Sequence, residues 1–120
     1  MPDTRLAELT RLLDVATLRQ RVHAGNLANQ NTPGFKARAV AFEEAFNQAL
    51  DHGGLDAALA VDPELTVPQT TPSQPDGNDV AVDNEVAAMA KNQELYNAYI
   101  QLARGKMRLI NTAISSAPGG

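Results

Sequence analysis

The strongest pattern along the chain is a seven-residue repeat of apolar positions in its last third. From residue 82 to residue 114, apolar side chains recur at alternating steps of four and three, and only Gln93 interrupts them. A second apolar stripe flanks this seam, so the apolar face is broader than that of a two-stranded coiled coil. The pattern predicts a C-terminal helix over residues 82–116. The predicted seam residues are Val82, Val86, Met89, Tyr96, Ile100, Ala103, Met107, Ile110 and Ile114.

Apolar positions in the first thirty residues also recur at steps of three and four. This spacing predicts an amphipathic N-terminal helix over residues 4–30. The side chains expected on its bundle seam are Leu6, Leu9, Leu13 and Val22. The helix is followed by Thr32-Pro33-Gly34-Phe35. Proline at the second position and glycine at the third are typical of a type II turn, in which the third residue takes a positive φ.

The middle of the chain is less regular. Residues 31–50 are expected to hold the turn and a short helix over 40–50. Residues 51–79 have no sustained period and are punctuated by glycine and proline. We expect an irregular acidic loop there, ordered mainly by partners, with a brief strand around residues 65–67.

These elements predict a mainly α fold in a single domain spanning residues 1–120. The two long helices would reach about 50 Å and about 40 Å at 1.5 Å per residue. They are expected to form an antiparallel, coiled-coil-like hairpin around the irregular central loop. One pair of helices cannot cover all of this apolar surface, so we expect the hairpin to bundle with neighbouring subunits.

Charge is distributed unevenly along the chain. The net charge of −4 combines +3 over residues 1–40, −10 over residues 41–90 and +3 over residues 91–120. The acidic middle has two interpretations: a solvated loop, or a surface that attracts the basic ends of neighbouring copies. The negative net charge and the small number of aromatic residues, five in all, argue against a nucleic-acid partner.

Candidate chemistry is sparse. There is no cysteine, and the two histidines are expected on a helix surface (His23) and in an exposed loop (His52). Adjacent Glu43 and Glu44 diverge on a helix, so they do not form a catalytic pair. We therefore predict no enzyme activity, no cofactor and no small-molecule substrate.

Residues 76–79 (Asp-Gly-Asn-Asp) lack the alternating ligands and the final glutamate of a calcium loop, so no metal site is predicted. No apolar run is long enough to span a bilayer, and the N-terminus is unlike a cleaved secretory signal.

Residues 26–35 resemble the signature of the flagellar axial proteins, the family of rod, hook and hook-associated subunits. In that family the N-terminal helix ends in a motif of the form ANxxTPG followed by an aromatic residue. The residues assigned to this assembly motif are Asn26, Ala28, Asn29, Thr32, Pro33, Gly34 and Phe35. Residues 76–86 resemble the lead-in to the C-terminal helix of rod subunits. The two matches lie at both ends of the chain, and the acidic middle matches nothing specific.

The resemblance implies a structural role. The chain lacks the inserted β-rich domains of hook and distal rod subunits, which favours one of the two short proximal rod proteins. One of these two proteins usually carries a Glu-Ala-Asn-Val motif in its final helix, and this motif is absent here. The resemblance therefore favours the other, and the protein with the motif remains the alternative within the family. An adaptor or export chaperone in the cytosol, binding a partner helix in its apolar groove, is the alternative from another class.

A proximal rod subunit would connect the membrane ring and export gate to the distal rod and transmit torque. The implied partners are other copies of the chain, other rod subunits, proteins at the junction of the membrane ring and export gate, and the flagellar type III export apparatus. The implied location is the periplasmic rod of the basal body, reached without a cleaved signal peptide.

Overall fold

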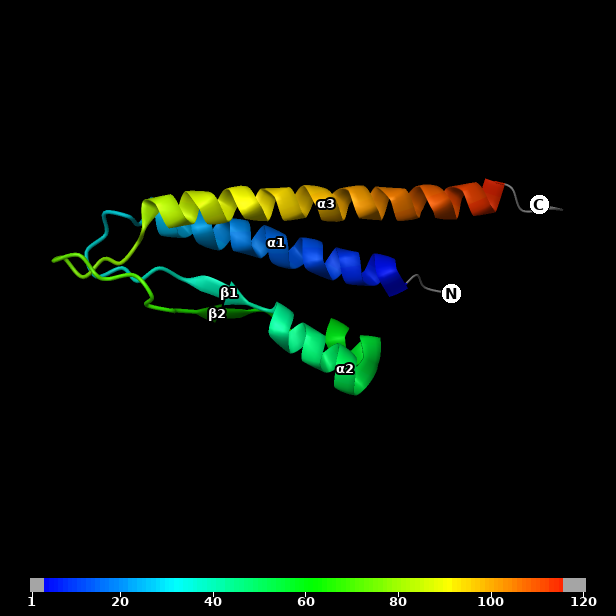
Figure 1. The fold of residues 1–120 in the computed structure, drawn as a ribbon, viewed down its shortest axis with the longest axis horizontal. Helices are drawn as coiled ribbons and strands as arrows, with labels where there is room; N and C mark the ends of the chain where they lie inside the picture. The colour runs from blue at the N-terminus through cyan, green and yellow to red at the C-terminus, as the bar shows by residue number, and fades with distance from the viewer. Residues whose placement is uncertain (1–3, 116–120) are drawn as a thin grey trace.

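The computed structural model of the chain describes residues 4–115. It contains three helices and a small two-stranded sheet (Figure 1). The elements in chain order are α1 (Thr4–Ala28), β1 (Ala39–Ala41), α2 (Glu43–Leu59), β2 (Glu64–Thr66) and α3 (Val82–Ser115). The predicted fold class, mainly α with two long terminal helices packed together, is confirmed.

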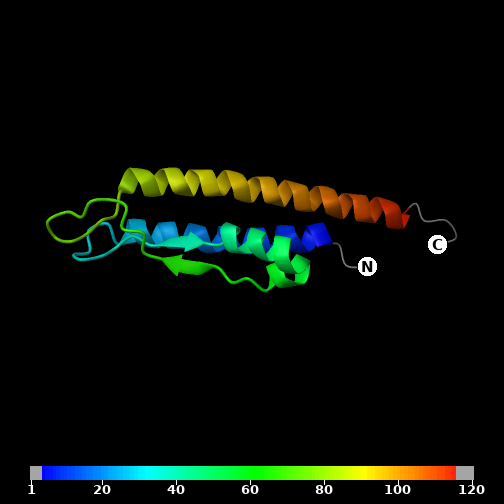
Figure 2. The same ribbon diagram turned by 60° about the horizontal axis from the view of Figure 1, so that its bottom comes forward.

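The elements form layers with α1 in the middle. The antiparallel helix α3 lies along one side of α1, and the sheet and α2 lie on the other (Figures 1 and 2). The molecule measures 72 × 29 × 15 Å, with a radius of gyration of 18.8 Å. A compact domain of this length would have a radius of gyration of roughly 14 Å. The protein is therefore an extended hairpin, and much of α3 has no covering layer.

The main apolar core lies between α1 and α2. Its buried members are Val15, Phe42, Phe46 and Ala58, and the two phenylalanine ring centroids are 5.2 Å apart. Arg11 of α1 stacks over the Phe42 ring at 5.7 Å. These contacts hold α2 against the face of α1 that points away from α3.

Helix α2 corrects the expectation for the middle of the chain. It runs to Leu59, whereas a helix was expected only over residues 40–50 and an irregular loop from residue 51. Gly54 has φ +79, which turns the helix sharply, and the helical turn after it places Ala58 in the core at 0% exposure. Gly54 is itself non-helical, so α2 consists of two helical segments that meet at a kink at the glycine pair.

Other boundaries differ by small amounts. Residues 39–41 form β1 and pair antiparallel with β2, which begins one residue before the strand expected at residues 65–67. Helix α1 ends at Ala28, two residues before the predicted end. Helix α3 begins at residue 82 as expected, and residue 116 lies outside the described residues.

Candidate assembly site

The turn that follows α1 has the geometry that its residues predict. The Phe35 amide donates to the Thr32 carbonyl at 3.2 Å, which closes the turn across Pro33 and Gly34. Gly34 has φ +76, as the third position of a type II turn requires. The Thr32 amide also donates to the Asn29 carbonyl at 3.0 Å, so the turn continues directly from the end of α1.

The side chain of Asn78, which lies much later in the sequence, forms hydrogen bonds to this turn. Its side chain is fully buried, and its amide nitrogen Nδ2 donates to the carbonyls of Asn29 (2.9 Å) and Thr32 (2.8 Å). Its Oδ1 accepts from the Val80 amide at 2.8 Å. A side-chain amide offers two donors and an acceptor at once, and all three are used here. Asn78 thus adds a second hydrogen bond to two carbonyls of the turn after α1, which also accept from the Thr32 and Phe35 amides.

Backbone contacts fasten the same two segments. The Gly34 amide donates to the Asp76 carbonyl at 2.8 Å, and the Asp79 amide donates to the Phe35 carbonyl at 3.2 Å. Gly77 has φ +85, and a Cβ on it would lie 3.3 Å from the Gly34 Cα. The two segments therefore approach so closely that a side chain at position 77 would crowd the backbone of Gly34. We call residues 29–37 together with residues 76–80 the interlock.

Asp76 and Asp79 serve the interlock through their carboxylates. Asp76 accepts from the Asn78 amide at 3.0 Å, and Asp79 accepts from the Ala37 amide at 2.6 Å. Among residues 4–115, no group of three or more His, Cys, Asp or Glu side chains is placed to hold a metal ion. This segment thus works as a capping and turn element.

A second polar cluster joins α1, the residue before β1 and α3 beside the interlock. Asn26 is 1% exposed; its Oδ1 accepts from the Arg38 amide at 3.0 Å, and its Nδ2 donates to the Arg38 carbonyl at 2.8 Å. The same Nδ2 donates to Glu85 Oε2 at 3.0 Å, and His23 Nδ1 lies 2.6 Å from that oxygen. The expectation of a surface His23 is therefore wrong, because the histidine packs against the first turn of α3.

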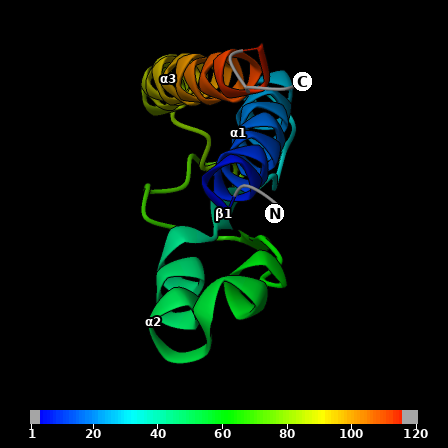
Figure 3. The ribbon, with the colours of Figure 1, turned by 90° about the vertical axis from the view of Figure 1, so that its right-hand side faces the viewer.

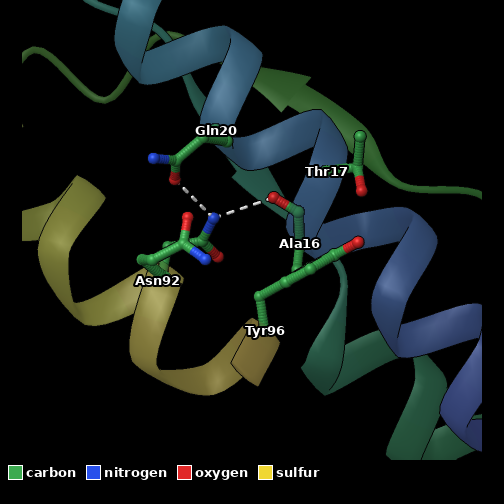
Figure 4. Close-up of a pocket in the computed structure, with 6 residues that line it drawn as sticks. Ala16, Thr17, Gln20, Asn92 and Tyr96 are labelled. Carbon is green, nitrogen blue, oxygen red and sulfur yellow. Dashed lines mark hydrogen bonds between the residues drawn. The ribbon is translucent and has the colours of Figure 1, made fainter. Parts of the chain in front are cut away.

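A third polar contact fixes α3 along α1 (Figure 4). Asn92 Nδ2 donates to the Ala16 carbonyl and to Gln20 Oε1, both at 2.8 Å. The two buried residues of α3 are Glu85 and Asn92, and both are polar. The α1–α3 contact is therefore specified by hydrogen bonds, which set the relative position of the helices along their axes.

The predicted assembly motif divides between buried and exposed positions. Asn26, Asn29, Thr32 and Gly34 bond within the interlock or the cluster beside it. Phe35 is half-buried under the Arg38 guanidinium at 5.9 Å, while Ala28 and Pro33 are exposed. Sequence reasoning missed the polar partners Gln20, His23, Glu85 and Asn92, because single polar residues within apolar periods carry little signal.

The predicted seam residues do not form one buried stripe. On α1, Leu9 is buried, while Leu6, Leu13 and Val22 are half-buried. On α3, the half-buried members are Met89, Tyr96, Ile100, Ala103 and Ile110, and the exposed members are Val82, Val86, Met107 and Ile114. Val22 lines a groove with Phe35 and Leu65 on the sheet side of α1. The face of α3 next to α1 leaves apolar side chains on both of its flanks.

No protein-family model matches the chain, but full-length curated proteins do. The flagellar basal body rod protein FlgB of Borrelia hermsii is 31% identical over 122 residues, which cover 87% of this chain and 90% of that protein. The chain belongs to the FlgB family of flagellar basal body rod proteins.

Other FlgB proteins match over similar lengths. The Bacillus subtilis protein is 28% identical over 123 residues, covering 92% of each chain. The Escherichia coli K12 protein is 27% identical over 122 residues, covering 87% of this chain and 88% of that protein. The predicted resemblance to flagellar rod proteins is confirmed, and the match to FlgB spans most of the hairpin. None of the described helices has the length and apolar content needed to cross a membrane.

Proposed function

We propose that this FlgB-family chain is a structural subunit that polymerises through its terminal helices in the proximal rod of the flagellar basal body. It would link the membrane ring and export gate to the distal rod and transmit torque. Its neighbours would be further copies and other rod subunits, together with proteins at the ring and gate junction. It would reach the periplasmic rod through the flagellar type III export apparatus without a cleaved signal peptide, and it would catalyse no reaction.

The observation that carries this proposal is the exposed apolar surface of α3. Leu102, Leu109 and Ile114 are 60%, 67% and 69% exposed. Fully burying one such side chain contributes about 1.5–3 kcal/mol. Exposed apolar side chains on more than one flank of α3 mark an interaction surface, and a helical lattice of neighbouring subunits would cover them.

The interlock supports the mechanical part of the proposal. It ties the end of α1 to the segment that leads into α3 through hydrogen bonds at 2.8–3.2 Å from both sides. A load applied to one helix would pass to the other through this cross-connection as well as along the backbone. The polar side chains of the site bond to backbone groups or to one another, which fits a structural role and not a reactive one.

A complementation experiment tests the proposal. In a strain that lacks its own copy of the gene, the double variant Leu102→Lys/Leu109→Lys should be exported but should be absent from purified basal bodies, and cells should not swim. Ala87→Lys adds charge at an exposed position of the same helix, outside the recess that Leu102 and Leu109 line, and should support swimming. Incorporation of the double variant into basal bodies at the wild-type level would contradict the proposal.

A further inference from the structure

One row of side chains on α3 combines apolar residues at regular intervals with a pattern of charges beside them. Val86, Gln93, Ile100, Met107 and Ile114 follow each other at intervals of seven residues, so they line up along the helix. We call them the outer row. Val86, Met107 and Ile114 are 52%, 48% and 69% exposed, and Ile100 is half-buried. Figure 3 shows α1 on one side of α3, with the sheet and α2 beyond it, which leaves the other sides of α3 uncovered.

The charged residues beside the outer row are separated by the sign of their charge along α3. Glu94 lies in the first half of α3, and Arg104 and Arg108 lie in the second half. At 100° per residue, all three project from the same side of the row. All are exposed, and within residues 4–115 none forms an ion pair. An acidic first half and a basic second half complement an antiparallel copy of the same surface.

We propose that a second copy of the chain packs antiparallel on the outer row, with Ile100 of each copy at the two-fold axis. In this register Val86 faces Ile114 of the second copy, and Gln93 faces Met107. Glu94 then falls between Arg104 and Arg108 of the other chain, twice by symmetry. Sliding the copies by one heptad would place Glu94 opposite Tyr99 or Ala113 and remove these ion pairs. The charges therefore select one register.

The shape of the surface fits this pairing. A recess lined by Ala16, Thr17, Gln20, Asn92 and Tyr96 opens beside Gln93 (Figure 4). The pairing brings Met107 of the second copy to this recess, and methionine is the side chain that adapts best to an irregular apolar gap. A second recess, beside Ile100, Ala103 and Met107, lies where the first half of the other α3 would pack.

The dimer goes beyond the proposed function. A contact with two-fold symmetry uses the same surface on both partners and closes, so it cannot grow into a filament. The outer row is also part of the apolar surface that a rod neighbour would cover. The antiparallel dimer is thus a form of the unassembled chain, and it must separate before a copy joins a rod.

Cysteine cross-linking tests the symmetry, because the chain contains no cysteine of its own. Ile100→Cys in the full chain should oxidise to a covalent dimer, since the axis brings this position against itself within the roughly 4.4–6.8 Å Cα separation that a disulfide needs. Leu102→Cys, on the opposite flank of α3, is the matched control and should remain monomeric. Equal cross-linking of the two variants would overturn the proposal.

Charge reversal tests the register. In sedimentation velocity of the purified full chain, Glu94→Arg should raise the dimer dissociation constant at least about tenfold, and so should Arg104→Glu/Arg108→Glu. Combining all three changes in one chain should restore the constant to within about threefold of wild type. A triple variant as weak as its parents would refute the register. A chain that is monomeric at all concentrations but supports swimming would refute the dimer and leave the rod role standing.

Discussion

The two ends of the helical hairpin differ in the side chains that they bury and expose. At the closed end, the interlock and the cluster around Glu85 bury Asn26, Asn78 and Asp79, and these polar groups are bonded within the chain. At the open end, α3 is 34 residues long against 25 for α1 and carries exposed leucine, methionine and isoleucine.

Directional bonds fix one geometry, whereas apolar surface provides free energy to any partner that covers it. The closed end therefore defines the shape of the subunit, and the open end provides surface for association. The following changes separate these two roles, starting with the largest expected effect.

Asn78→Ala should disrupt the closed end most. It removes the second hydrogen bond of the Asn29 and Thr32 carbonyls, which still accept from the Thr32 and Phe35 amides, and it leaves the Val80 amide without its acceptor. The unsatisfied buried Val80 amide costs about 1–3 kcal/mol, and each of the two lost hydrogen bonds from Nδ2 contributes about 1 kcal/mol, so we expect a loss of about 3 kcal/mol in the free energy of unfolding. Urea denaturation followed by circular dichroism measures it. The exposed Asn47→Ala should change little; equal midpoints for the two variants would show that the interlock does not stabilise the fold.

Gly34→Val should damage the closed end by strain. A β-branched residue at φ +76 costs about 1–3 kcal/mol and alters the turn after α1. We expect assembly and swimming to be blocked while export stays largely intact, measured by motility and by immunoblots of exported protein. Gly25→Ala, in a helix with open space around the new methyl group, should be tolerated. Normal swimming of Gly34→Val cells would contradict the role of the turn.

Ile100→Asp acts at the open end. Ile100 is half-buried in the isolated chain, so the unfolding free energy should fall by only about 1 kcal/mol. In the assembled state, however, the variant should reduce helix content, because the charge enters a contact between helices. Circular dichroism of free and assembled protein compares the two states. Assembly equal to that of wild type would mean that this position does not contact a neighbouring helix.

Glu43→Gln should have the smallest effect and should depend on pH. The hydrogen bond from Arg19 holds the pKa of Glu43 below its ordinary value of 4.5. The folded state therefore favours the charged form. Its stabilisation is fully present above the ordinary pKa and is lost as pH falls through the lowered pKa. For this half-exposed, solvent-screened pair we expect about 0.5 kcal/mol at pH 7 and none in strong acid.

Thermal unfolding across pH checks this, with Glu44→Gln as the control that removes the same charge from the neighbouring position. If the two variants have the same unfolding temperature at every pH, the ion pair between Arg19 and Glu43 contributes nothing to the stability of the fold.

Local patterns predict the long helices and the turn well. The seven-residue repeat and the Pro33-Gly34 pair act over a few residues, so no tertiary information is needed. The extension of α2 could not be predicted in this way, because burial of Ala58 against Phe46 decides it. The hydrogen bonds between distant polar side chains also cannot be predicted from the local sequence, because Asn26 and Glu85 are 59 positions apart. An asparagine on an apolar face, as at Asn92, is the available signal for such contacts.

The cap supplied by Asn78 also sets an order of events. The carbonyls to which Asn78 donates lie 49 and 46 residues earlier in the sequence. A chain that emerges with its N-terminus first can form α1 and the turn after it from local hydrogen bonds, but the turn is not joined to the segment before α3 until residue 78 arrives. Closing a loop of this size is a slow, non-local step. The rigid geometry of the closed end therefore appears late, after nearly two thirds of the chain has emerged, and a shorter nascent chain does not have it.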